Sequence, residues 1–269
     1  MRDINDRYLM DCALASERSY FRLAAEEHSG EHLLFAVVPG LESLPAASVC
    51  ILDAEKLNMN ELSQAIKEGE EAFARAGAHT ARFYIGETDK NFSAFMEGRS
   101  YRRRTEIVHA VAPLPIDQDD PSGAHWRKIS CEEDWAEKAA IHTPPSLASD
   151  GYASHPSLWL SLERHKAATG KIDFWIYALA GPANGRAVAT TGLMRCGDGI
   201  LRIKNFFVQS DCRGKGIGKL ALRCLLRQLK STDENAAVLL SIEGSVGERL
   251  YRSVGARDIG HIYEWSRES

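Results

Sequence analysis

One glycine-rich turn holds the residues of this 269-residue chain that are best suited to chemistry. Apolar residues predict a strand that ends at Val208, and an amphipathic pattern predicts a helix over residues 219–230. The first N–H groups of a helix have no partner within it, and together with the helix dipole they bind anions. Glycine lets an anion approach the backbone, and cationic side chains suit a phosphate-bearing ligand. The turn contains Arg213, Gly214, Lys215, Gly216, Ile217, Gly218 and Lys219.

Two nucleotide-binding motifs compete for this turn. A P-loop requires glycine where the chain has Arg213, and serine or threonine where it has Leu220. The dinucleotide fingerprint G-x-G-x-x-[G/A] is matched by Gly216, Gly218 and Ala221, but too few residues follow to complete a doubly wound sheet. The P-loop is therefore excluded, and a dinucleotide site or a glycine turn without a ligand remain as alternatives.

The turn and its surroundings resemble the GNAT superfamily of acetyl-CoA-dependent N-acetyltransferases. The family signature is [Q/R]-x-x-G-x-[G/A] after a strand end of two apolar residues and valine. A downstream family pattern, Leu-Tyr followed four residues on by Gly-aromatic, has its counterpart in Leu250-Tyr251 and Gly255-Ala256, with alanine in the aromatic position. The residues that match the signature are Phe206, Phe207, Val208, Arg213, Gly216 and Gly218.

This resemblance implies that acetyl-CoA binds at the turn as the co-substrate. Backbone groups of Phe207 and Val208 would bond the pantetheine arm where two parallel strands splay apart. Amides from Arg213 through Lys219 would hold the pyrophosphate. Tyr251 would face the sulfur and protonate the departing CoA thiolate, a role that suits a phenol because it is neutral at pH 7.

The general base is less clear from the sequence. Many family members carry a glutamate four residues before the valine, a position that is Lys204 here, and an asparagine where this chain has Gly244. The adjacent Glu243 is the base candidate, directly or through water, and the alternative for it is a solvated carboxylate at a strand end. An amine can also lose its proton through water. Further candidates in the second half are Glu163, His165 and Asp173.

The elements around the turn occur twice along the chain. Each half contains, in order, a strand, a long helix, a strand, a short helix and a final strand. The predicted ranges are 47–52, 58–77, 81–85, 92–96 and 103–111 in the first half, and 201–208, 219–230, 237–242, 246–254 and 259–265 in the second. The fold class is therefore α/β (an α+β mixed sheet), with two GNAT-like units, each a mixed, largely antiparallel sheet flanked by helices.

The two units are expected to differ in function. In the first half, residues 53–60 contain two acids and no glycine, so they cannot hold a pyrophosphate in the same way. We therefore expect a degenerate N-terminal unit at residues 1–112 and an acetyltransferase domain at residues 125–269. The proline- and acid-rich residues 113–124 form the linker. A first helix is expected over roughly the first 25 residues, ending at residues 28–30.

Composition excludes several classes of protein. Hydrophobic residues make up 44% and charged residues 26%, which is typical of a globular chain. The net charge of −4 and the pI of about 6.2 argue against nucleic-acid binding. No apolar run approaches the roughly 20 residues of a membrane span, and no signal-peptide core or C-x-x-C pair is present. We expect a cytoplasmic protein without a bound metal, and an exposed final strand would allow a homodimer.

The sequence thus predicts an acyltransferase that moves an acetyl group from acetyl-CoA to an amine by direct attack on the thioester. The acceptor is a small-molecule or peptide amine that the sequence does not identify. The alternatives are a CoA-binding regulatory pseudoenzyme, favoured by Lys204 and Gly244, and a dinucleotide-binding protein.

Overall fold

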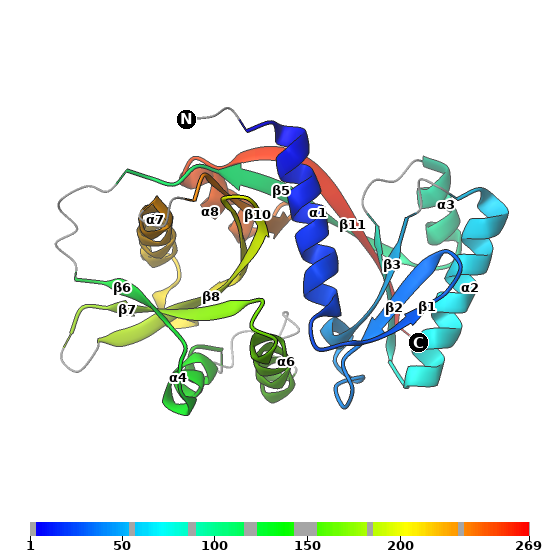
Figure 1. Cartoon of the computed structure of the whole chain (residues 1–269), viewed down its shortest axis with the longest axis horizontal. Helices are drawn as coiled ribbons and strands as arrows, with labels where there is room; N and C mark the ends of the chain where they lie inside the picture. Colours follow the sequence, from blue (N-terminus) through cyan, green and yellow to red (C-terminus); the bar gives the residue numbers. More distant parts are fainter. Residues whose placement is uncertain are drawn as a thin grey trace.

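The computed structural model describes residues 4–53, 57–85, 90–115, 123–142, 155–181, 185–230 and 234–268. Its strands form one 11-stranded mixed sheet, in the order β1-β2-β3-β4-β11-β5-β10-β9-β8-β7-β6 (Figure 1). The strands are β1 (Glu26–Ser29), β2 (Leu33–Val37), β3 (Ser48–Leu52), β4 (Thr80–Ile85), β5 (Arg102–Val111), β6 (His125–Lys128), β7 (Asp173–Leu179), β8 (Arg186–Gly197), β9 (Ile200–Val208), β10 (Ala236–Ile242) and β11 (Arg257–Glu268). The helices are α1 (Asp6–Arg22), α2 (Met59–Ala76), α3 (Lys90–Gly98), α4 (Glu132–His142), α6 (Pro156–Ala168), α7 (Ile217–Lys230) and α8 (Val246–Ser253), with 3-10 turns η1 (Pro45–Ala47) and η4 (Ser210–Cys212).

The two halves of the chain exchange strands at the centre of this sheet. β5 follows β4 in the sequence, yet β11 from the C-terminal half lies between them in the sheet. In the same way, β11 follows β10 in the sequence, and β5 from the N-terminal half lies between these two. β5 and β11 pair antiparallel along most of their length and run side by side from one half to the other (Figure 1). Each half therefore needs a strand of the other to complete its sheet.

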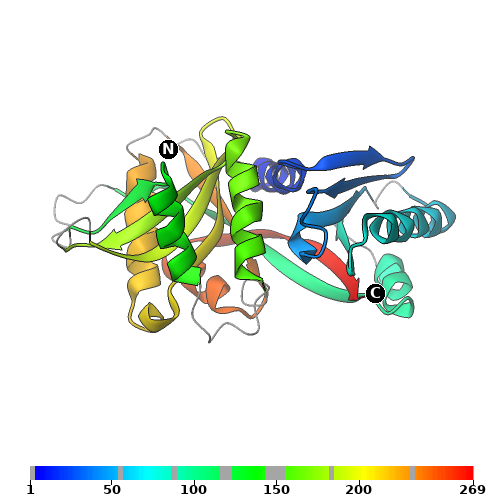
Figure 2. The ribbon, with the colours of Figure 1, turned by 90° about the horizontal axis from the view of Figure 1, so that it is seen from below.

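Helix α1 also joins the two halves. Asn5 caps its start by accepting a hydrogen bond from the amide of Arg7. The apolar face of α1, including Leu9 and Ala13, shares one buried core with Tyr84 of β4 and Val238 of β10. Figures 1 and 2 show α1 lying across the sheet between the halves. A Cβ at Gly260 would lie only 2.8 Å from the Met10 sulfur, so any larger residue there would force the Met10 side chain to move.

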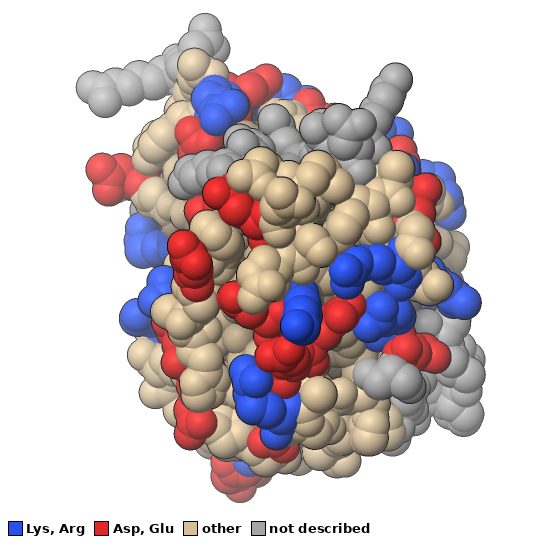
Figure 3. Space-filling model, turned by 90° about the vertical axis from the view of Figure 1, so that its right-hand side faces the viewer, with Lys and Arg blue, Asp and Glu red and all other residues tan. Residues whose placement is uncertain are grey.

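The sheet of the C-terminal half is covered on both faces. On one face, α7 and α8 pack against β9 and β10, with Leu222 and Tyr251 in a core with Ile203 and Leu239. On the other face, the core of α1 includes residues of β7, β10 and α4. In the N-terminal half, α2 packs over β2 and β4. Acidic and basic side chains are interspersed on the end of the molecule formed by this half (Figure 3).

The predicted fold class is confirmed, with two differences at the ends of the chain. The first helix ends at Arg22 and not at residues 28–30, because Glu26–Ser29 form strand β1, antiparallel to β2. The four residues of β1 are polar and all are exposed, so the sequence has no apolar alternation there that would indicate a strand. The final strand β11 is not an exposed edge, because β4 and β5 flank it, so it offers no free edge for a homodimer.

Residues 116–122 of the expected 113–124 linker and residues 143–154 between α4 and α6 lie outside the described residues. Asp53, which begins the glycine-free segment of the N-terminal half, forms an ion pair with Arg18 of α1. No helix of the described segments is long and apolar enough to cross a membrane.

Candidate active site

The parallel strands β9 and β10 part at the centre of the C-terminal half. Their pairing runs only as far as Ile203 and Leu239. Beyond this point β9 continues to Val208 beside β8, and β10 continues to Ile242 beside β5. The register of β9 against β8 shifts near Asn205, whose φ of 52° marks a bulge. One edge of each strand is thus left without a strand partner, and a gap opens between the ends of β9 and β10.

The glycine-rich turn lies at the end of β9, where it leads into α7. Gly214 and Gly216 have φ values of 72° and 79°, which L-residues rarely adopt, and a Cβ at either would meet nothing within 4 Å. The first hydrogen bond of the helix runs from the amide of Leu220 to the carbonyl of Gly216. Within the described chain, none of the amides from Gly214 to Lys219 has a hydrogen-bond acceptor. This is the arrangement of an anion site at a helix start.

Cationic side chains surround these amides. The Arg213 Nε donates to the carbonyl of Val208 at 2.9 Å, and its guanidinium lies 4.8 Å from the centre of the Phe207 ring. Lys215 and Lys219 are exposed beside the free amides. Arg213 thereby fixes the end of β9 against the turn, and the lysines remain available to a polyanion. Gly218 packs against Val208 and Leu250, so a larger residue there would push α7 away from the strand.

Tyr251 projects from α8 toward the sheet, where it is 7% exposed. Burial raises the pKa of Tyr251 to about 12, so the phenol stays protonated over the whole physiological range. Its ring meets the edge of the His109 ring, with 5.5 Å between the centres. His109 comes from the exchanged strand β5, and its Nε2 lies 2.7 Å from the hydroxyl of Ser241 and its Nδ1 2.9 Å from Asp258. Burial lowers the pKa of His109, which favours a neutral ring beside the tyrosine.

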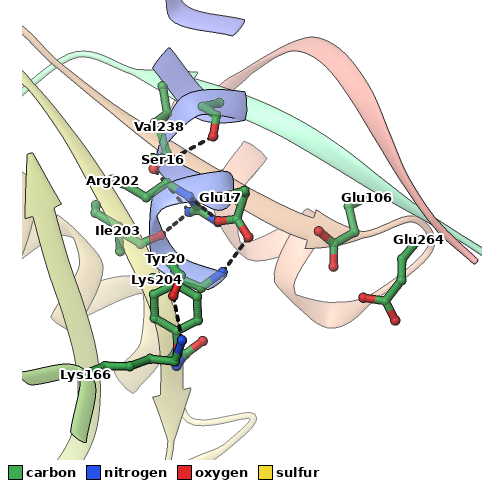
Figure 4. A network of polar contacts seen from close by, with 12 residues as sticks. Ser16, Glu17, Tyr20, Glu106, Lys166, Arg202, Ile203, Lys204, Val238 and Glu264 are labelled. Carbon is green, nitrogen blue, oxygen red and sulfur yellow. Dashed lines mark hydrogen bonds and ion pairs between the residues drawn. The ribbon is translucent and has the colours of Figure 1, made fainter. Parts of the chain in front are cut away.

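Lys204 occupies the position of the missing glutamate, and it is not available as a base. Its ammonium lies 2.6 Å from Glu17 of α1, and Arg202 bonds the other oxygen of the same carboxylate at 2.8 Å (Figure 4). Burial alone would raise the pKa of Glu17, but Lys204 and Arg202 lower it to about 2. Glu17 was not predicted from the sequence as a functional residue. Its signal was a glutamate on the apolar side of an amphipathic helix, between Ala13 and Tyr20.

The other candidates lie in different surroundings. Glu243 follows β10 at the surface, and its amide donates to the carbonyl of Thr105 at 3.1 Å. Glu163 is fully buried, 3.0 Å from the ammonium of Lys138, and it accepts a hydrogen bond from the Asn205 amide, which holds the β9 bulge. His165 is exposed on α6, and Asp173 pairs with Lys128 at the surface.

Comparison with known proteins relates this geometry to one family. Residues 135–255 match the model of the acetyltransferase (GNAT) family. A GCN5-related N-acetyltransferase from Kribbella flavida superimposes with a TM-score of 0.66 at 15% identity, covering 96% of each chain. A GCN5-related N-acetyltransferase from Sphaerobacter thermophilus gives a TM-score of 0.60 at 17% identity, covering 98% of this chain and 91% of its own.

The two-unit arrangement also has a solved counterpart. A tandem GNAT protein from the clavulanic acid biosynthesis pathway gives a TM-score of 0.59 at 11% identity, covering 99% of this chain and 95% of its own. No curated protein matches the sequence. Residues 135–255 therefore match the GNAT acetyltransferase family, and the chain as a whole has a fold similar to that of a tandem GNAT protein.

Proposed function

We propose that the chain transfers an acetyl group from acetyl-CoA to a primary amine, which attacks the thioester directly. The family of residues 135–255 implies transfer of an acetyl group from acetyl-CoA. The observation that carries the proposal is the run of amides from Gly214 to Lys219, which have no acceptor among the described residues and lie at the mouth of the gap between β9 and β10. Oriented amides and nearby lysines suit the pyrophosphate of CoA, and the gap suits its extended pantetheine arm.

In this proposal, backbone groups of Phe207 and Val208 bind the pantetheine arm. Tyr251 donates a hydrogen bond, and then its proton, to the departing thiolate, which its protonated state favours. Glu243, the base candidate from the sequence, lies exposed at the end of β10 and would have to act through water. The acceptor belongs to the class of small-molecule or peptide amines.

We further propose that residues 125–269 carry out catalysis and that residues 1–112 support them, with residues 113–124 as the connection. The strand β5 and the helix α1 are the means of support, because they contribute His109 and Glu17 to the C-terminal half. All six cysteines are free thiols. Free thiols suit a reducing compartment, and we propose the cytoplasm.

A thermal-shift titration with acetyl-CoA, CoA and NAD tests this proposal. Acetyl-CoA and CoA at about 100 times their Kd should each stabilise the protein by about 2.7 kcal/mol, because ligands that bind only the folded state shift the unfolding equilibrium. NAD should give no shift. A shift with NAD alone would favour the dinucleotide alternative. Binding of CoA without transfer to any amine in a broad screen would favour the regulatory alternative. The ion pair of Lys204 with Glu17 supports this alternative, because it leaves no base at position 204.

Substitution of Gly216 by valine should weaken the affinity for acetyl-CoA about tenfold or more. The new side chain would project into the space in front of the free amides, where a phosphate would bind. The left-handed backbone costs any L-residue about 1–2 kcal/mol in fold stability, so a control with equal strain is needed. Gly40→Val provides it, because Gly40 also has a φ of 79° and open space around its Cβ, but lies far from the turn in the sequence. Calorimetric Kd values that are equal for the two variants would contradict a phosphate site at Gly216.

A further inference from the structure

The exchanged strand β5 carries a carboxylate to the gap between β9 and β10. Glu106 pairs with Ile242, the terminal residue of β10, so it lies one strand away from the gap. Neighbouring strands are about 4.8 Å apart, so one strand spacing separates the backbone of Glu106 from that of β10. Side chains alternate along a strand, and Glu106 therefore shares the face of Val108 and Ala110, which pack in the core of α1. His109 faces the opposite side, toward Tyr251.

The other carboxylates on this face are held in strong ion pairs. Glu17 is held by Arg202 and Lys204. Glu264 accepts two hydrogen bonds from Arg82, at 2.6 and 3.2 Å, and a third from Arg104 at 2.9 Å. Burial opposes ionisation of both groups, but the cations hold their pKa values below the ordinary range. Both carboxylates are thus weak bases that hold the two halves together.

Glu106 differs from these two carboxylates. Among the described residues its one ion-pair partner is Arg104, at 2.8 Å, which is partly exposed and is shared with Glu264. Burial raises the pKa of Glu106, and the charges of Glu17 and Glu264 raise it further against the attraction of Arg104. Figure 4 shows Glu106 and Glu264 on β5 and β11, across from the Glu17 ion pairs on α1. A carboxylate in such surroundings accepts a proton more readily than its neighbours do.

A second group points to a ligand in the same place. Tyr84 of β4 is 2% exposed, and its hydroxyl has no hydrogen-bond partner among the described residues. Tyr84 lies opposite Glu264 in the pairing of β4 with β11, and β5 with Glu106 is the next strand of the sheet. Burial raises the pKa of Tyr84, and the charges of Glu17, Glu106 and Glu264 raise it further. A buried hydroxyl without a partner costs free energy, and a bound amine would satisfy it.

We infer that Glu106 is the general base of the proposed acetyl transfer and that the acceptor amine binds between the two halves, at Glu106 and Tyr84. The inference rests on the proposed function. The acceptor arrives as an ammonium ion and loses one proton to Glu106, which passes it to solvent. The nitrogen then attacks the thioester carbon, so that a C–N bond forms and the C–S bond breaks. As the tetrahedral intermediate collapses, the nitrogen loses its second proton to solvent, and Tyr251 protonates the thiolate and regains a proton from solvent.

This arrangement places acid and base on opposite faces of the sheet. Tyr251 approaches beside β10 from the side of α8, and Glu106 lies on the side of α1. The groups that face Glu106 are Arg104 on its own strand, Glu264 on β11, Glu17 on α1, Lys204 on β9 and Tyr84 on β4. Because this site lies between the halves, the N-terminal half would supply the base that the C-terminal half lacks at Lys204.

The test compares two probe amines in the full chain, methylamine and 2,2,2-trifluoroethylamine. Methylamine is protonated at neutral pH and needs a base, whereas trifluoroethylamine is largely unprotonated. Glu106→Gln should lower kcat/KM for methylamine about 10²-fold and remove the rise of kcat/KM with pH that the ionisation of Glu106 causes. The loss for trifluoroethylamine should be much smaller, and the Kd for acetyl-CoA should not change. A purely structural defect would lower both rates equally.

Controls separate the outcomes. Glu71→Gln, on an exposed face of α2, should leave both rates unchanged, and Glu106→Asp should keep the pH dependence if Glu106→Gln folds poorly. A normal rate in Glu106→Gln, an equal loss for both amines, or loss of the pH dependence in Glu243→Gln instead would overturn the role of Glu106 and leave the proposed function standing. Binding of acetyl-CoA by the unaltered protein without transfer to these two amines or to any amine in a broad screen would overturn both.

Discussion

Replacing Tyr251 with phenylalanine should lower kcat by about 10²–10⁴-fold, the usual contribution of a positioned proton donor. The ring fills a buried space between α8 and His109, and phenylalanine would fill the same space. The Kd for acetyl-CoA should therefore stay within about twofold, since the loss falls on the transition state and not on cofactor binding. Steady-state kinetics of thiol release measure kcat, and calorimetric titration with acetyl-CoA measures the Kd.

The pH dependence adds a second criterion for Tyr251. Because burial raises its pKa to about 12, ionisation of this tyrosine should not reduce kcat below about pH 11. Tyr8→Phe, at an exposed position on α1, serves as the matched control and should leave kcat unchanged. If Tyr251→Phe keeps full kcat, another group protonates the thiolate and the proposed role of Tyr251 is wrong.

Replacing Glu17 with glutamine should lower the free energy of unfolding by about 3–5 kcal/mol, because it leaves two buried cations without their carboxylate. Arg202 is 3% exposed and cannot lose its proton, so in the variant it would remain a buried charge without its carboxylate. Burial already lowers the pKa of Lys204, and loss of the Glu17 carboxylate would lower it further. Urea unfolding at pH 7 measures the loss, and Glu27→Gln, in an exposed pair with Arg22, should cost less than about 1 kcal/mol.

The sign of the pH effect follows from the direction of the Glu17 shift. Its pKa is about 2 in the folded protein, below the value of about 4.3 for an unfolded chain. Its contribution to stability is therefore complete above the unfolded pKa and is lost as the pH falls toward 2. The stability difference between the unaltered protein and Glu17→Gln should shrink between pH 5 and pH 2. A difference that is constant over this range would show that the carboxylate charge is not what stabilises the junction.

The sequence predicted the parts of the molecule that depend on local pattern. The glycines, the cations and the strand before them lie within a dozen residues, and the helix and strand order of both halves follows from periodicity. The ion pair between Glu17 and Lys204 joins residues that are 187 positions apart in the sequence, so no local pattern indicates it. The sequence shows that Lys204 replaces the family glutamate, but it does not show that Glu17 is the ion-pair partner of Lys204.

The strand exchange could not be predicted for a similar reason. The composition of β5 and β11 indicates strands, but a local pattern does not say which strands will be their neighbours in the sheet. The order of elements suggested that each half closes its own sheet. Only the three-dimensional arrangement shows that β5 and β11 change places, and with them His109 and Glu106 enter the sheet of the C-terminal half.

This exchange has a consequence for how the chain acquires its structure during synthesis. The sheet of the N-terminal half remains open beside β4 until residues 257–268 have been made, so this half cannot finish folding when it first leaves the ribosome. Its exposed strand edges must wait for the C-terminal half, and pairing over such distances in sequence slows folding. The two halves therefore reach their final form together, and neither is a separate folding unit in the cell.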